Sequence, residues 1–313
     1  MNSPIDLNAS GLIPINKPRG ISSKDISRAL TRRFGKLKLG HVGTLDPDAD
    51  GVLPVLIGRA TKLQDYLLDM AKAYSFNLRL GTATDTLDAS GQITSQQPWD
   101  HVTPDQVSQV AKFFIGEITQ LPPLFSAVKY KGKELYKYAR SGHSDRDIPL
   151  EDLQRHVSIT SLTVDYCRLP DIGFTVHCSK GTYVRTLGFD MATKLQTTGH
   201  VTELTRIQSA GFNLRHCITI EQATSSEGSL ESILIPFDQI AIGLPAWQAD
   251  DMLLVRRLID GQRVIIKTPV SLEVPSSGDF EILIKSPEDK NIGIVTATLL
   301  EGENLKLHMK RGL

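Results

Sequence analysis

Alternation of apolar and polar residues predicts several strands in the first two thirds of the chain. The segment "AYSFNLRLG" alternates strictly, so Tyr74, Phe76, Leu78 and Leu80 are expected on one face of a strand. The segment "VLPVLIG" is apolar throughout and is expected to be buried. Two β-rich runs, "HVSITSLTVDYCRL" and "GFTVHCSKGTYV", are separated by "PDIG", a pattern that predicts a β-hairpin.

Helical periodicity together with capping residues predicts three helices. In "SSKDISRALTRRFG" the helix is expected to begin after Ser22 or Ser23 and to end at Gly35. Thr103 and Pro104 mark the start of a second helix in "TPDQVSQVAKFFIGEI". A third helical pattern lies in "VRTLGFDMATKLQ".

The pattern changes near residue 245. From there on, short strands such as "RVIIK", "FEILIK" and "IGIVTATLL" are divided by polar turns. A chain of 313 residues is also longer than a typical single domain. We therefore expect a large domain over residues 10–244 and a small β-rich domain over residues 245–313.

The composition of the chain limits which binding partners and which cellular compartment are expected. Lys plus Arg and Asp plus Glu both number 35, so a polyanion must be met by local basic patches rather than by the net charge. Cys167, Cys178 and Cys217 are too far apart for a CxxC-type metal or redox motif, which favours a reducing cytosol. The sequence has neither a run of about 18 apolar residues nor a signal-peptide pattern, so a cytoplasmic protein with no membrane partner is expected.

The stretch "GTLDPDADGVL" places Asp46, Asp48 and Asp50 at alternate positions, followed by Gly51. An EF-hand loop that begins at Asp46 requires a bidentate glutamate at its twelfth position, where this chain has Ile57. We therefore expect no metal here. Two interpretations remain from composition alone: a solvated acidic turn, or a turn that presents one reactive carboxylate.

Two basic segments are candidates for contact with RNA. "TRRFGKLK" is the first, and "KYKGKELYKYAR" interleaves Lys129, Lys131 and Lys133 with tyrosines. Basic and aromatic side chains together suit RNA phosphates and unstacked bases. The alternative for both segments is a solvated charged face.

Four segments, "INKPRGISS", "LGHVGTLDPDADGVLPVLIGRATK", "KAYSFNLRLGTATDTLDASG" and "SKGTYVRTLGFDM", resemble in order and spacing the TruB family of tRNA pseudouridine synthases. The resemblance covers roughly residues 10–240. It implies a cofactor-free isomerase that converts the T-loop uridine (U55) of tRNA to pseudouridine. It also implies an α+β fold with a mixed, mainly antiparallel sheet and flanking helices, and a monomer with tRNA rather than a protein as its partner.

The resemblance extends to the small domain and to an insertion. "LLVRRLIDGQRV" and "GIVTATLLEGENLKLHMKRG" are similar to a PUA domain, a small RNA-binding β-barrel, although the tail departs from the usual basic-proline ending. A small β domain used only for packing is the alternative. The second basic segment falls in an insertion, about residues 124–150, that in the family folds over the T loop.

The resemblance assigns roles to individual residues. Asp46 is the expected nucleophile, Tyr74 is expected to stack on the target base, and Arg185 is expected to pair with the nucleophile. Further residues are expected to bind the substrate: His41, which helps to reshape the T loop, Lys17, Asp88, Tyr183, Leu204, Lys129, Lys131 and Lys133. Simpler structural roles are the alternatives for several of these residues. They are core packing for Tyr74, packing in the pocket wall for Tyr183, a turn histidine for His41, surface charge for Lys17 and a turn-forming side chain for Asp88.

The expected chemistry leaves two routes open. A carboxylate can attack C1′ of the ribose, as in a retaining glycosidase, or add to C6 of the base. The family usually has uncharged residues after the aspartate, so the carboxylates of Asp48 and Asp50 are expected to point to solvent. A non-catalytic RNA binder on the same fold is the rival hypothesis, and the intact set of Asp46, Tyr74 and Arg185 argues against it.

Overall fold

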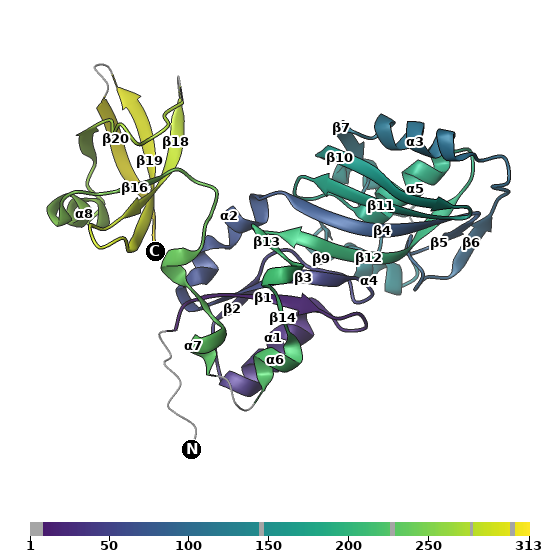
Figure 1. The fold of residues 1–313 in the computed structure, drawn as a ribbon, viewed down its shortest axis with the longest axis horizontal. Helices are drawn as coiled ribbons and strands as arrows, with labels where there is room; N and C mark the ends of the chain where they lie inside the picture. Colours follow the sequence, from purple (N-terminus) through teal and green to yellow (C-terminus); the bar gives the residue numbers. More distant parts are fainter. Residues whose placement is uncertain (1–8, 144–146, 226–228, 276–277, 301–303) are drawn as a thin grey trace.

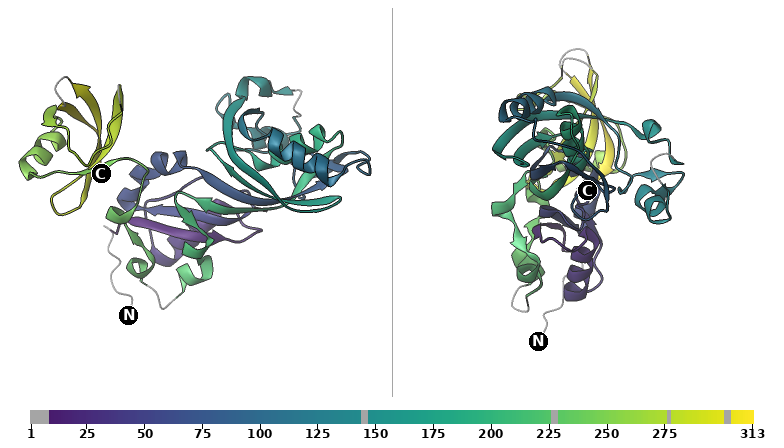
Figure 2. Two further views of the ribbon diagram at one scale, coloured as in Figure 1. Left: turned by 45° about the horizontal axis from the view of Figure 1, so that its top comes forward. Right: turned by 90° about the vertical axis from the view of Figure 1, so that its right-hand side faces the viewer.

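The two largest sheets of the chain have separate cores and give the molecule an elongated shape (Figures 1 and 2). The computed structural model describes residues 9–143, 147–225, 229–275, 278–300 and 304–313. The larger sheet has 11 strands and the smaller has five. Figure 2 shows the small sheet at one end of the molecule.

The large sheet is mainly antiparallel, and only the pairs β1–β14 and β3–β12 are parallel. Its main path runs in the order β14 (Ile218–Thr219), β1 (Gly11–Lys17), β3 (Asp50–Ile57), β12 (Gly199–Ser209), β4 (Lys72–Leu80), β11 (Asp171–Cys178), β10 (Arg155–Arg168) and β7 (Gly116–Gln120). The strands β2 (Leu39–His41), β13 (Phe212–Asn213) and β15 (Ile235–Pro236) pair beside this path. The expected strand at β4 and the β10–β11 hairpin are confirmed, whereas β12 was not predicted.

The three expected helices are confirmed, and others join them. The helices are α1 (Ser23–Phe34), α2 (Gln64–Asp69), α3 (Pro104–Phe113), α4 (Leu135–Arg140), α5 (Val184–Lys194), α6 (Ile220–Thr224), α7 (Leu230–Ile233) and α8 (Met252–Ile259). Short 3₁₀ turns lie at Gly58–Leu63, Leu150–Leu153, Leu214–His216 and Phe237–Gln239. Ser22 caps α1 and Thr103 caps α3, each through a capping box. Within the described ranges, no helix is long and apolar enough to cross a membrane.

The core of the large sheet forms where β4 and β11 pair. Tyr74, Phe76, Leu78 and Leu80 are all buried on one face of β4, as the alternation predicts. Phe76 stacks on Phe174 of β11, with ring centroids 5.2 Å apart. Helix α5 packs against β4 and β12 on this face.

Two short hairpins lie outside the large sheet. The strands β5 (Thr82–Thr84) and β6 (Ile93–Gln96) pair only with each other, as do β8 (Lys129–Tyr130) and β9 (Lys133–Glu134). The second hairpin, together with α4, forms the segment expected to be an insertion. It has a small core of its own, made by Leu124, Leu135, Ile148 and Leu150.

The small sheet has the order β16 (Ala246–Gln248), β18 (Asp279–Lys285), β19 (Asn291–Leu300), β20 (Asn304–Gly312) and β17 (Val264–Lys267). The three strands expected from the sequence correspond to β17, β18 and β19. Helix α8 packs against β17 and β20, a helix that was not predicted. Trp247, Val255 and Ile282 lie in the separate core of this unit.

A second apolar cluster joins the small sheet to the large one. Leu12 of β1 and Leu56 of β3 belong to the same buried cluster as Leu283 of β18 and Ile294 of β19. A polar contact lies beside it, because the Tyr66 hydroxyl donates a hydrogen bond to Glu281 at 2.7 Å. The small sheet therefore packs against β1 and β3 through this apolar cluster.

The loop between β2 and β3, residues 42–49, lies over two buried cations. The Lys17 side chain is 0% exposed, and its ammonium donates to the carbonyl oxygens of Pro18 at 2.9 Å, Ile21 at 2.8 Å and Pro47 at 3.3 Å. Burial lowers the pKa of Lys17 to about 8. Lys17 thus ties the end of β1 and the start of α1 to the loop.

Arg206 of β12 is the second of these cations. Its guanidinium donates to the carbonyl oxygens of Val52 at 2.8 Å, Val42 at 3.3 Å and Gly43 at 3.0 Å. The Ser23 hydroxyl adds another tie between the loop and α1, because it both donates to Leu45 O at 3.0 Å and accepts from Leu45 N at 2.9 Å. The loop is therefore held through its backbone from two sides.

The expectation that both extra carboxylates of this loop point to solvent is half wrong. Asp48 is exposed, but Asp50 is only partly exposed, and its Oδ1 atom is buried without a hydrogen-bond partner among the described residues. The cause is the adjacent β3, since Asp50 is the first residue of that strand. Its charge is attracted to Lys17 and raises the pKa of that lysine against the effect of burial.

Removing Lys17 should destabilise the fold. In Lys17→Met, three carbonyl oxygens lose their buried donor, so we expect the free energy of unfolding to fall by about 2 kcal/mol or more. Urea unfolding followed by circular dichroism measures this change. Lys112→Met, at an exposed position of α3, is the control and should stay within about 0.5 kcal/mol of wild type. Equal losses in the two variants would contradict the role given to Lys17.

A chain that ends at Leu244 should still fold, because the large sheet has its own core. Its melting temperature should drop by several degrees, because Leu12 and Leu56 lose the apolar cover of β18 and β19. Tyr66→Phe in the full chain removes only one hydrogen bond to the small sheet and should cause a smaller drop. Absence of any cooperative melting transition in the shortened chain would contradict an independent large unit.

Candidate active site

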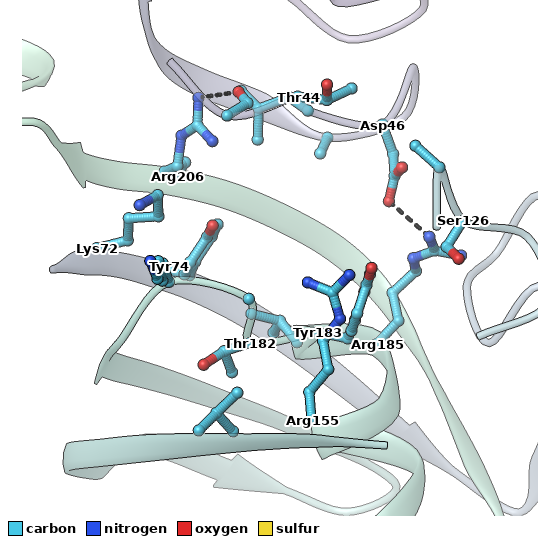
Figure 3. A pocket seen from close by; sticks show the side chains of 18 of the residues that line it. Thr44, Asp46, Lys72, Tyr74, Ser126, Arg155, Thr182, Tyr183, Arg185 and Arg206 are labelled. Carbon is cyan, nitrogen blue, oxygen red and sulfur yellow. Dashed lines mark hydrogen bonds and ion pairs between the residues drawn. The ribbon is translucent and has the colours of Figure 1, made fainter. Parts of the chain in front are cut away.

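A cavity of about 790 Å³ opens where the β2–β3 loop faces β4, β12 and the start of α5. Residues distant in the sequence meet around it: Asp46 from the loop, Tyr74 from β4, Tyr183 and Arg185 from the start of α5, and Arg206 from β12 (Figure 3). Leu204 of β12 lines it as well. Five of these six, all but Arg206, were expected at the substrate site from the sequence. The fold thus brings the proposed nucleophile, stacking residue and pairing arginine to one cavity.

Asp46 and Arg185 form an ion pair at the edge of this cavity. Arg185 Nη2 lies 2.9 Å from Asp46 Oδ2, and the side chains are 6% and 41% exposed respectively. The guanidinium also donates to Thr86 O at 2.6 Å and to Phe125 O at 3.0 Å. These carbonyl contacts fix the arginine, so the ion pair aims a carboxylate that is still half open to the cavity.

Asp88 supports the arginine from its other side. Asp88 Oδ2 lies 3.5 Å from Arg185 Nη1. Its Oδ1 accepts hydrogen bonds from the hydroxyls of Thr86 and Ser90, both at 2.6 Å. Asp88 lines a smaller cavity of about 170 Å³ on the far side of Asp46 rather than the main one. Its geometry therefore combines a turn-forming side chain with a contact to the ion pair.

Two tyrosines form part of the cavity wall. Tyr74 is 9% exposed, and burial raises the pKa of its phenol. Tyr183 precedes the first turn of α5, and its backbone is fixed by Gln120, which accepts from Tyr183 N at 2.9 Å and donates to Tyr183 O at 3.3 Å. Burial raises the pKa of Tyr183 as well. Both phenols are therefore kept neutral around neutral pH.

Several residues at the cavity were missed by sequence reasoning, namely Lys72, Ser126, Arg155 and Arg206. Lys72 is buried with its pKa lowered to about 8 by that burial, and it donates to Leu68 O at 2.8 Å and Met70 O at 3.0 Å. The signal for Arg206 was weak, because β12 has register shifts that interrupt its alternation. The strand pairing is what reveals that this arginine is buried at the site.

His41 and Lys17 lie outside the lining of the main cavity. His41 ends β2, its Nε2 lies 3.1 Å from Thr44 Oγ1, and burial lowers its pKa. Lys17 is directed into the backbone carbonyls under the loop. The position of Lys17 suits holding the loop rather than touching RNA, whereas substrate contact by His41 stays a prediction.

Two of the three lysines expected to bind RNA lie over aromatic rings of the insertion. Lys131 Nζ is 5.1 Å from the centroid of the Tyr130 ring, and Lys133 Nζ is 4.6 Å from that of Tyr138. Lys129 and Lys131 are exposed, and Lys133 is partly exposed. The expected mixture of basic and aromatic groups is therefore present on the surface of this segment.

In the parts of the chain that the structure describes, no three His, Cys, Asp or Glu side chains gather to hold a metal ion. The arrangement around the cavity offers instead one oriented carboxylate, an arginine that balances its charge, and an aromatic wall. Such a set suits covalent attack by a carboxylate on a planar substrate.

Comparison with known proteins agrees with this geometry. The family model "TruB family pseudouridylate synthase (N terminal domain)" matches residues 31–184. A tRNA pseudouridine synthase B from Geobacter sulfurreducens is 43% identical over 72% of this chain and 73% of its own length. The same enzyme from Staphylococcus aureus strain RF122 is 37% identical over 81% of this chain and 85% of its own.

Solved structures share the fold at lower identity. A chain of an H/ACA RNP bound to a substrate RNA containing 2′-deoxyuridine aligns with a TM-score of 0.71 and 21% identity, over 96% of this chain and 84% of that one. A chain of an archaeal box H/ACA Nop10–Cbf5 complex aligns with a TM-score of 0.70 and 21% identity, over 99% and 88%. With its curated relatives matched over most of their length, this chain belongs to the TruB family of pseudouridylate synthases.

Proposed function

We propose that this protein isomerises the T-loop uridine (U55) of tRNA to pseudouridine, with Asp46 as the nucleophile. Its relatives carry the name tRNA pseudouridine synthase B. The observation that carries the assignment of Asp46 is its ion pair with Arg185 at 2.9 Å, on the edge of a cavity walled by Tyr74. This pair supplies an oriented carboxylate where a base can enter.

The reaction breaks the bond between N1 of the base and C1′ of the ribose, turns the base, and joins C5 to C1′. The proton on C5 then leaves and N1 takes up a proton, so the substrate and the product have the same composition. Asp46 attacks either C1′ or C6 to hold the intermediate. Arg185 stabilises the carboxylate before attack and again as the intermediate breaks down. No oxidant, reductant or energy source is consumed.

The target base must leave its stack to reach Asp46. The cavity offers the flipped base the Tyr74 ring on one wall and the apolar side chains of Leu204 and Ala49 nearby. Tyr74 stacks on the base, and its oxygen accepts the proton from C5 in the last step. Tyr183 closes the wall near the ion pair.

The remaining contacts place the RNA over the cavity. The insertion, residues 124–150, supplies Lys129, Lys131 and Lys133 to phosphates, and His41 meets the T loop beside the active-site loop. Residues 245–313 act as a PUA-like RNA-binding domain, and residues 10–244 carry the chemistry. The protein acts as a monomer on tRNA.

Asp46→Asn tests the proposed nucleophile, because it keeps the size of the side chain and removes its charge. We expect binding of a T-loop RNA to persist while the rate of pseudouridine formation falls by at least ~10³-fold. Asp48→Asn, at an exposed position of the same loop, should stay within a few-fold of wild type. If Asp46→Asn converts uridine as fast as wild type, Asp46 is not the nucleophile.

The matched substitution at Asp50 is not a neutral control. Its carboxylate is partly buried and attracts Lys17, so Asp50→Asn perturbs the loop that carries Asp46. A protein that binds tRNA but forms no pseudouridine even as wild type would instead be a non-catalytic binder.

Replacement of Lys129, Lys131 and Lys133 together by Ala tests the proposed RNA contact. If each neutralises one phosphate, affinity for tRNA should fall and the magnitude of the salt slope should drop by roughly one unit or less per lysine. Fluorescence anisotropy across a series of salt concentrations measures both. If the triple variant binds tRNA with unchanged affinity and an unchanged salt slope, the segment is only a solvated charged face.

A further inference from the structure

Arg206 lies on β12, the strand between β3, which follows the loop that carries Asp46, and β4, which carries Tyr74. β12 pairs with β3 on one side and with β4 on the other. Arg206 is the register partner of Gly51, just after the active-site loop, and of Tyr74 on β4. Residues directly opposite on antiparallel strands have Cβ atoms about 4.5–5.5 Å apart and share a face. The arginine is therefore placed beside both the loop and the tyrosine.

Arg206 packs closely against the β2–β3 loop and the start of β3. The guanidinium holds the carbonyls of Val42, Gly43 and Val52, and the backbone of β12 approaches Gly51 so closely that a Cβ there would lie 2.3 Å from Arg206 O. Gly51 also has a φ of 103°, which favours glycine. A shift of this arginine would move the segment that presents Asp46.

On the other side the guanidinium faces the tyrosine. The Tyr74 hydroxyl is directed toward Arg206 (Figure 3). Arg206 is 1% exposed and Tyr74 9% exposed, so an interaction between them is shielded from water. Burial raises the pKa of Tyr74, and the nearby charge of Arg206 acts in the opposite direction. Lys72 adds a second buried cation next to Arg206.

We propose that Arg206 is a positioning residue that fixes the Tyr74 oxygen as the acceptor of the C5 proton while it holds the loop that carries Asp46. This inference rests on the proposed function. In the last step the C5–H bond breaks and its electron pair restores the C5–C6 double bond of the ring. The Tyr74 oxygen accepts this proton as its own phenolic proton passes to water, and N1 takes up a proton from solvent. The guanidinium stabilises the negative charge that develops on that oxygen as its phenolic proton departs, as an oriented donor in a water-poor site does.

The test uses Arg206→Lys, which keeps the charge but loses the planar set of donors. Single-turnover rates are measured with T-loop RNA that carries hydrogen or deuterium at C5 of the target uridine. We expect the rate to fall by roughly 10-fold or more, within the contribution of a general base, while RNA affinity stays within a few-fold. The deuterium isotope effect should exceed that of wild type, because proton removal becomes slower than the preceding steps.

Arg79→Lys is the matched control. Arg79 lies on β4 opposite His200 of β12 and is paired to Asp171 at 2.8 Å, at the other end of the same strand pairing. Its rate and isotope effect should equal those of wild type. A slower Arg206→Lys enzyme with an unchanged isotope effect would reduce Arg206 to a packing role and overturn the inference. A wild-type protein that forms no pseudouridine would refute the proposed function itself.

Arg206→Gln serves if the lysine variant does not fold, because it retains an amide donor without charge, and the same isotope criterion applies to it. If neither variant folds, the contact is tested in wild type by nuclear magnetic resonance. A nuclear Overhauser effect between the Arg206 Nη hydrogens and the Tyr74 ring, assigned with Tyr74→Phe, supports the inference. Its absence from a spectrum in which both groups are resolved would overturn it.

Discussion

The structure depends on how one loop is held through its backbone. Lys17 and Arg206 are both buried, and each donates to three carbonyl oxygens within or beside the β2–β3 loop. Desolvating a cation is costly unless its hydrogen bonds are satisfied. These carbonyl oxygens accept the hydrogen bonds of both cations. The loop backbone therefore holds the two cations in place, and the two cations hold the loop in its conformation. Asp46 can therefore extend from the loop without being needed to hold it.

The same loop explains why three carboxylates so close in sequence have different roles. Asp46 meets Arg185, which carbonyls of two other segments already fix. Asp48 is exposed, and Asp50 begins β3 close to Lys17. Local environment, rather than the alternating pattern, separates the proposed nucleophile from a solvated carboxylate and a partly buried one.

Much of this arrangement was predictable from sequence, and the missing part has a physical cause. The strict alternation of β4 placed Tyr74, and the motif resemblance named Asp46 and Arg185, which the fold brings together. Arg206 was missed because β12 pairs with strands distant in sequence, and its register shifts interrupt the alternation that would reveal a strand. The partial burial of Asp50 depends on the same kind of long-range contact, which no local pattern encodes.

The most direct test of the account is a crystal structure of Asp46→Asn bound to a T-loop RNA. The account predicts that the target uridine is flipped into the main cavity, with its base against Tyr74. Either C1′ or C6 should then lie about 3–3.5 Å from the side-chain amide at position 46, the separation of a near-attack geometry. A uridine that is flipped into the cavity with both carbons beyond reach of that side chain would contradict the central claim.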